Sequence, residues 1–157
     1  GRISVSRSIL TGLFVASAMT CQGWFGAGQV AAADADIVEK MTAGKIERIM
    51  SDLTLVNVTE IDNNTYRFEY EGLKILVFNK EDTMQLYAGF SGAKISLSRI
   101  NEWNKTKRFT RAYLDKDNDP VLEGDIELTG GVTEKNVKEW IKTYQVSIRA
   151  YKKHLEE

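Results

Sequence analysis

The spacing of apolar residues over residues 42–90 predicts one helix followed by four strands. Thr42 suits the N-cap of a helix that runs to about Leu53, because its hydroxyl can accept a hydrogen bond from a free amide of the first turn. Apolar residues recur at helical spacing along this helix, which marks its buried stripe: Ile46, Ile49, Met50 and Leu53. The strands are expected at Thr54–Ile61, Thr65–Glu71, Leu73–Phe78 and Met84–Phe90. Leu73–Phe78 is apolar except for Lys74, which we take as typical of a central strand covered on both faces.

Beyond Ser91-Gly92 the pattern predicts a helix, two strands and a final helix. The short helix runs from about Lys94 to Asn104, with Leu97, Ile100, Asn101 and Asn104 on one face. Alternating residues then indicate a fifth strand, with Phe109, Arg111 and Tyr113, and a sixth, with Leu122, Gly124, Ile126 and Leu128. Thr133 caps the last helix, whose apolar stripe is Val137, Trp140, Ile141, Tyr144, Ile148, Tyr151 and Leu155.

This order of elements predicts an α+β domain. We expect a twisted, mostly antiparallel sheet of about six strands, packed by three helices. No repeat, low-complexity tract or linker divides residues 34–157, so they form one domain.

Residues 1–33 have the composition of a secretory signal. Arg2 and Arg7 are their only charged residues, and an apolar stretch from Ile9 to Met19 follows. Small residues before Asp34 suit signal peptidase, so we expect cleavage after Ala33. An uncleaved anchor in the inner membrane is the alternative, although glycines and polar residues dilute the apolar run.

The overall composition excludes several classes of function. The chain has 21 Lys+Arg against 22 Asp+Glu, which argues against a nucleic-acid-binding protein. One Cys and one His cannot form an internal disulfide or a Cys/His metal site, and Cys21 would be removed with the signal. His154 falls in the last turn of the final helix, where it suits the helix dipole better than general-base catalysis. We therefore expect no catalytic residues, no cofactor and no metal.

The segment from Asp115 to Asp119 has the carboxylate spacing of half a calcium loop. Pro120 stands where that loop needs glycine, and Ile126 stands where it needs a bidentate glutamate. A hairpin loop explains the segment better, because Asp and Asn favour turn conformations.

A symmetric hairpin would pair Leu114 with Val121 and place Arg111 opposite Gly124 on the inner face of the sheet. Two interpretations remain open for this arginine. It extends to the sheet edge as a structural residue, or it binds a carboxylate of a partner together with Arg108.

The asparagines and aromatic residues of the second half also allow two interpretations. Asn101 and Asn104 are expected to cap the end of their helix and hold the next strand. Trp103, Trp140, Tyr144 and Tyr151 are expected in the core, or one or two of them in a surface groove that binds a peptide.

Several uncommon residues of this half resemble the YbjN-domain family of bacterial sensory transduction regulators. The runs are Ile100-Asn101-Glu102-Trp103-Asn104, Arg108-Phe109, Ala112-Tyr113-Leu114-Asp115, Asp119-Pro120-Val121-Leu122-Glu123 and Gly130-Gly131-Val132-Thr133. The resemblance implies a type III secretion chaperone-like fold, a homodimer and binding to extended protein segments. It implies no enzyme activity.

Together these features predict an exported, non-enzymatic protein-binding or chaperone-like module in a bacterial periplasm. The alternative is a periplasmic sensor with a small-ligand pocket between the sheet and the helices. The candidate binding residues are Arg108, Arg111, Trp103 and Tyr113. The structural motif comprises Asn101, Trp103, Asn104, Phe109, Asp119, Pro120, Gly130 and Gly131. Contact with a membrane is expected only if the N-terminal segment is not cleaved.

Overall fold

The computed structural model describes residues 37–157, so the expected signal segment lies outside the described residues. The helices are α1 (Ala43–Asp52), α2 (Leu97–Thr106) and α3 (Glu134–Glu156). The strands are β1 (Ile37–Val38), β2 (Val56–Asp62), β3 (Thr65–Tyr70), β4 (Leu73–Asn79), β5 (Thr83–Gly89), β6 (Arg111–Leu114), β7 (Pro120–Glu127) and β8 (Val132–Thr133).

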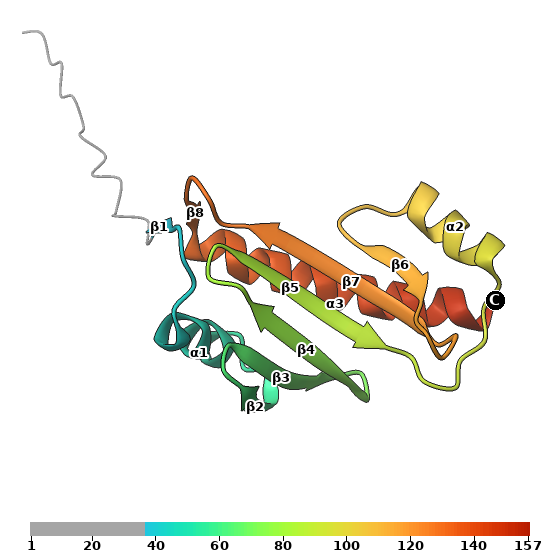
Figure 1. The fold of residues 1–157 in the computed structure, drawn as a ribbon, viewed down its shortest axis with the longest axis horizontal. Helices are drawn as coiled ribbons and strands as arrows, with labels where there is room; N and C mark the ends of the chain where they lie inside the picture. Colours follow the sequence, from blue (N-terminus) through green and yellow to red (C-terminus); the bar gives the residue numbers. More distant parts are fainter. Residues whose placement is uncertain (1–36) are drawn as a thin grey trace, which may run out of the picture. The chain divides into compact units, whose positions relative to one another are not determined.

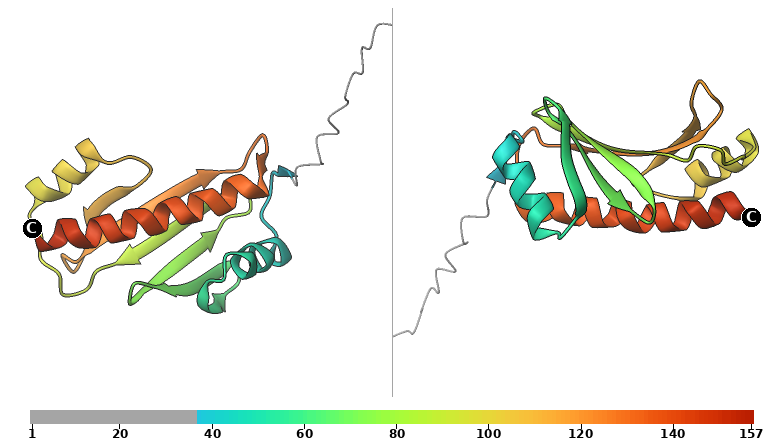
Figure 2. Two further views of the ribbon diagram at one scale, coloured as in Figure 1. Left: turned by 180° about the vertical axis from the view of Figure 1, so that it is seen from behind. Right: turned by 90° about the horizontal axis from the view of Figure 1, so that it is seen from below.

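Six strands form one antiparallel sheet in the order β2-β3-β4-β5-β7-β6. The three helices lie on one side of this sheet, and α3 crosses it along most of its length (Figures 1 and 2). The predicted α+β class, six strands and three helices are therefore confirmed. The prediction that β4 is covered on both faces is wrong, because no described helix covers the second face.

A second, two-stranded sheet joins β1 to β8 and was not predicted. Ile37 pairs with Thr133, and Val38 pairs with Val132. Strands of two residues are too short to show alternation, so periodicity could not reveal them. Gly131 stands at the approach to this pairing with a φ of +87°. A Cβ at Gly131 would lie 2.7 Å from a methyl carbon of Ile37, so the site requires glycine.

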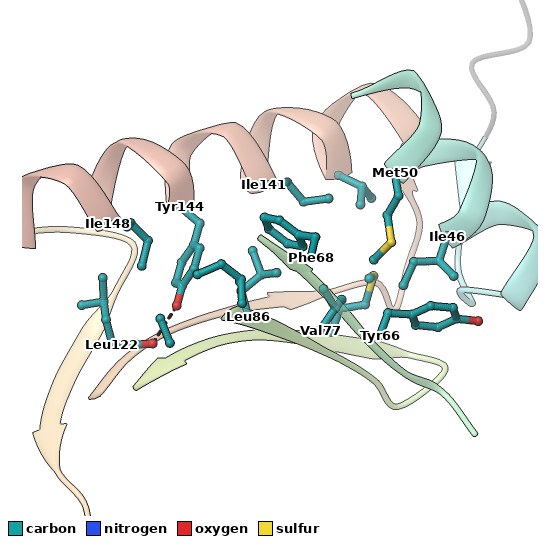
Figure 3. Packing of buried hydrophobic residues seen from close by; sticks show 14 of the residues in the cluster. Ile46, Met50, Tyr66, Phe68, Val77, Leu86, Leu122, Ile141, Tyr144 and Ile148 are labelled. Carbon is teal, nitrogen blue, oxygen red and sulfur yellow. Dashed lines mark hydrogen bonds between the residues drawn. The ribbon is translucent and has the colours of Figure 1, made fainter. Parts of the chain in front are cut away.

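The core lies between the concave face of the sheet and the helices. Alternate residues of β3, β4, β5 and β7 point toward α1 and α3 (Figure 3). The predicted stripe of α3 is confirmed at its five fully covered positions: Val137, Ile141, Tyr144, Ile148 and Tyr151. Tyr144 also donates its hydroxyl proton to the carbonyl oxygen of Leu122 at 2.7 Å. Burial raises the pKa of the Tyr144 hydroxyl, which keeps it a neutral donor.

The helix N-termini are capped by side-chain hydroxyls. Thr42 accepts from the amide of Lys45 and Thr133 accepts from the amide of Asn136, as predicted. The start of α2 was predicted three residues too early, because Ser96 caps this helix. Its buried face was also predicted wrongly. Ile100 and Trp103 are buried, whereas Leu97 is exposed, as are Asn101 and Asn104.

Candidate functional site

The convex face of the sheet is free of helices and carries a group of aromatic and apolar side chains. Strand alternation sends Leu76, Phe78, Tyr87, Val121 and Tyr113 to this face, opposite the core residues of the same strands. The rings of Phe78 and Tyr87 pack edge to face, with centroids 6.3 Å apart. Val121 is fully buried although no described helix covers it, so neighbouring side chains on this face cover it. We call these five residues, together with Arg111 and Glu123, the open face.

A buried carboxylate lies at one end of the open face. Glu123 is only 5% exposed and accepts hydrogen bonds from two neighbours on β6. Arg111 Nε lies 2.6 Å from Oε2, and the same oxygen is 2.5 Å from a terminal guanidinium nitrogen of Arg111. The hydroxyl of Tyr113 donates to Oε1 at 2.6 Å. These three donors satisfy a charge that would otherwise be costly to bury.

Both residues that bind Glu123, Arg111 and Tyr113, have raised pKa values. The hydrogen bond to Glu123 is the main cause that raises the pKa of Arg111, and burial is the main cause that raises the pKa of Tyr113. Arg111 therefore stays a cation and Tyr113 stays a neutral donor over the physiological pH range.

The predicted register of this hairpin is wrong by one residue. Leu114 pairs with Pro120, and Arg111 pairs with Glu123 rather than Gly124. A slip of one residue moves every side chain of a strand to the opposite face. Arg111 therefore lies on the convex face, and the carboxylate that it binds is that of Glu123 in its own chain.

The hairpin loop explains the slip, because it is tighter than the symmetric one we expected. The amide of Asp115 donates to the carbonyl oxygen of Asp119 at 3.0 Å. The Asp115 carboxylate accepts from the amides of Asp117 and Asp119, both at 2.9 Å. Asn118 adopts a φ of +63°, a conformation that asparagine tolerates. The carboxylates of this segment thus serve the turn, as the hairpin interpretation requires.

Asn104 closes the exposed edge of β6 with its side chain. Its amide donates to the carbonyl oxygen of Ala112 at 2.9 Å, and its oxygen accepts from the amide of Ala112 at 2.9 Å. The expectation that this residue holds the next strand is confirmed. Its side chain makes the two backbone hydrogen bonds that a further strand at this edge would otherwise make. Asn101 is exposed at the surface of α2.

The opposite edge, β2, is exposed along its whole length but is irregular. Its register with β3 shifts twice, and Asn57 has a φ of +55°. Such bulges twist an edge away from regular pairing with another strand. Strand addition is therefore hindered at both edges, which leaves the open face as the broad accessible surface of the sheet.

Trp103 is a core residue rather than an accessible binding residue. It is 1% exposed, its indole N–H donates to the Thr110 hydroxyl at 3.2 Å, and its ring packs on Tyr151 with centroids 4.8 Å apart. Burial raises the pKa of Tyr151 to about 12. Arg108 and Phe109 lie in the exposed loop before β6, so Phe109 is not part of the predicted fifth strand.

The remaining motif residues shape turns. Asp119 accepts a hydrogen bond from the amide of Gly92 at 3.1 Å, and the Pro120 carbonyl accepts from the amide of Phe90 at 2.8 Å. Gly130 and Gly131 take positive φ in the turn before α3. The structure of these turns therefore accounts for the four residues without a binding role.

The part of the chain that the structure describes holds neither a cluster of metal ligands nor a helix that could cross a membrane. Within residues 37–157, no group of three or more His, Cys, Asp or Glu side chains is arranged to hold a metal ion. His154 lies in the last turn of α3, where its Nε2 is 2.9 Å from the Arg99 carbonyl oxygen. None of the described helices has the length and apolar character needed to cross a membrane.

Comparison with known proteins agrees with this fold. The family model YbjN, "Putative bacterial sensory transduction regulator", matches residues 42–157. The structure is similar to the crystal structure of YbjN from E. coli, titled "a putative transcription regulator", with a TM-score of 0.55 and 16% sequence identity. That alignment covers 69% of this chain and 87% of the other. No curated protein matches the sequence. The chain, with its single antiparallel sheet backed by three helices, belongs to the YbjN family.

Proposed function

We propose that this YbjN-family chain is an exported, non-enzymatic protein-binding module, chaperone-like in holding a segment of another protein. The observation that carries the proposal is the open face, a group of aromatic and apolar side chains among charged ones that no described helix covers. An interface core is typically rich in Tyr, Phe and Arg, which are the residue types found there.

The hollow beside the open face favours a protein partner over a small ligand. The hollow lined by Arg111 and Glu123 has a volume of about 270 Å³ and is shallow. Small-molecule sites usually enclose about 300–1,000 Å³. The guanidinium of Arg111 is also already bound to Glu123. A sensor pocket between sheet and helices would occupy the space that the core side chains fill in Figure 3.

Site-specific photo-crosslinking tests the proposal. A photoreactive residue replaces Gln85, which lies on the convex face of β5, or Ala150, which is exposed on α3 as the matched control. We expect a protein adduct in periplasmic extract from the Gln85 position and none from Ala150. Equal labelling at both positions, or no adduct at either, contradicts the proposal. A small molecule retained by the purified protein in native mass spectrometry would favour the sensor.

The location and the oligomeric state are part of the same proposal. The signal-like segment supports export to the periplasm, and an uncleaved segment would instead anchor the domain at the inner membrane. N-terminal sequencing of the protein from a periplasmic fraction should begin at Asp34, within one residue. The homodimer suggested by the family resemblance is tested by light scattering of the purified protein.

A further inference from the structure

A run of cations extends from the last turn of α2 to the start of β6. Lys105, Lys107, Arg108 and Arg111 fall within seven residues that contain no acidic residue, in a chain whose charges are nearly balanced overall. All four side chains are exposed. Lys107 lies over the Trp103 ring and Arg111 pairs with Glu123. Within residues 37–157, no ion pair joins Lys105 or Arg108 to an acidic side chain.

Phe109 presents its ring in the middle of these cations. It is 70% exposed, the guanidinium of Arg108 lies 5.4 Å from its ring centroid, and its φ is +70°. The left-handed conformation is uncommon for a bulky residue and costs about 1–3 kcal/mol, and such strain concentrates at binding sites. Neither burial nor a regular strand explains why the chain holds an aromatic residue this way.

A hollow beside Phe109 leads to the surface of α3. It has a volume of about 300 Å³ and is lined by Phe109, Asn136, Glu139, Trp140 and Thr143. The two aromatic residues make its walls largely apolar, and the half-buried Trp140 is the largest of the lining side chains. Glu139 is paired with Lys142 at 2.9 Å, which offsets its charge. The volume lies at the lower limit of small-molecule sites, and it is large enough for one aromatic side chain.

We propose that this loop and hollow form a docking site for an acidic peptide segment that carries an aromatic residue. The aromatic side chain of the segment packs between Phe109 and Trp140, and a carboxylate of the segment binds Arg108. Guanidinium groups suit carboxylates because they donate in a planar fork. This inference rests on the proposed protein-binding function and adds a second surface, which adjoins the open face at Arg111.

The observations favour a peptide over an anionic lipid surface. A planar membrane binds in proportion to the apolar area that it buries, and one phenyl ring supplies little. Leu97, which is 70% exposed, begins α2, whereas the loop follows the end of this helix. Ten helical residues separate the two sites by about 15 Å.

Fluorescence anisotropy of labelled peptides tests the site. The probe is a fluorescein-labelled hexapeptide with one tryptophan among aspartates. One control peptide has alanine in place of the tryptophan, and another has lysines in place of the aspartates. We expect binding of the probe that weakens with added salt, and at least tenfold weaker binding of both control peptides.

Variants locate the binding on the protein. Arg108→Glu and Phe109→Ala should each weaken binding of the probe at least tenfold, whereas Lys94→Glu, before α2, should change it less than twofold. All three positions are exposed or partly exposed, so circular dichroism should show an unchanged fold. Equal binding by Arg108→Glu and the native protein overturns the proposal. Binding to phosphatidylglycerol vesicles without binding to the peptide also overturns it.

The two proposals fail separately. Loss of the Gln85 adduct with intact peptide binding removes the open face as the binding surface and leaves the loop site standing. An intact Gln85 adduct with no peptide binding removes only the loop site.

Discussion

Replacement of Arg111 by leucine should destabilise the protein by about 2 kcal/mol. The substitution removes two charge-assisted hydrogen bonds and leaves Glu123, whose side chain is 7% exposed, with Tyr113 as its remaining donor. Loss of one partner of a fully buried ion pair costs about 3–5 kcal/mol, whereas exposed pairs contribute about 0–1 kcal/mol. The side chain of Arg111 is 60% exposed, so its screening by solvent places the loss between these limits.

Urea unfolding followed by tryptophan fluorescence measures the effect. If the free energy of unfolding falls by about 1.5–2 kcal/mol per molar urea, the transition midpoint should fall by about 1 M urea. The double variant Arg111→Leu/Glu123→Leu should lose less stability than the two single variants lose in sum, because it leaves no buried charge without a partner. Arg111→Lys keeps the positive charge but not the planar guanidinium group. The midpoint of this variant should lie between those of the native protein and Arg111→Leu.

One outcome would refute this reasoning. If Arg111→Leu is as stable as the native protein or more stable, the arginine does not satisfy a buried carboxylate. That result is the one expected from an arginine that faces the apolar core, as the symmetric hairpin predicted.

Three further predictions concern other contacts. Gly124→Ala should destabilise the protein by about 1–3 kcal/mol in the same assay, because the new Cβ would lie 3.0 Å from the ring of Tyr144; an unchanged midpoint would show that the ring moves freely. Asn104→Ala should cost about 1–2 kcal/mol and promote association in light scattering, because the edge of β6 becomes open. Glu134→Gln should destabilise at pH 7 and hardly at pH 3. The hydrogen bond from Arg48 is the main cause that lowers the pKa of Glu134, so this stability exists above the unfolded-state pKa and is lost as pH falls through the folded-state value. An equal loss at both pH values would contradict that assignment.

Long periodic segments allowed most of the fold to be predicted. The apolar stripe of α3 spans about five turns, and the alternation of β3 and β5 is regular, so their buried faces were assigned correctly. The caps at Thr42 and Thr133 also follow from local chemistry alone. Sequence alone could not reveal the pairing of β1 with β8, because it depends on distant residues rather than on a local pattern.

The candidate site was harder to predict because it depends on the register between β6 and β7. Arg111 and Tyr113 were among the residues named from the sequence, but Glu123 was not recognised as their common partner. Its place depends on whether the hairpin loop has an odd or an even number of residues. The aspartates that tighten the loop were visible in the sequence, but their hydrogen bonds to the backbone were not. Exposure of Phe109 likewise depends on a backbone angle that alternation does not encode.

The pairing of β1 with β8 constrains the order in which the domain can fold. Ile37 is the first described residue and pairs with Thr133, so its partner is synthesised only after every strand of the main sheet. Contacts between residues so far apart in sequence form slowly, because a long loop must close first. During synthesis, the first strand of the described domain therefore stays unpaired until all the strands of the main sheet have been made.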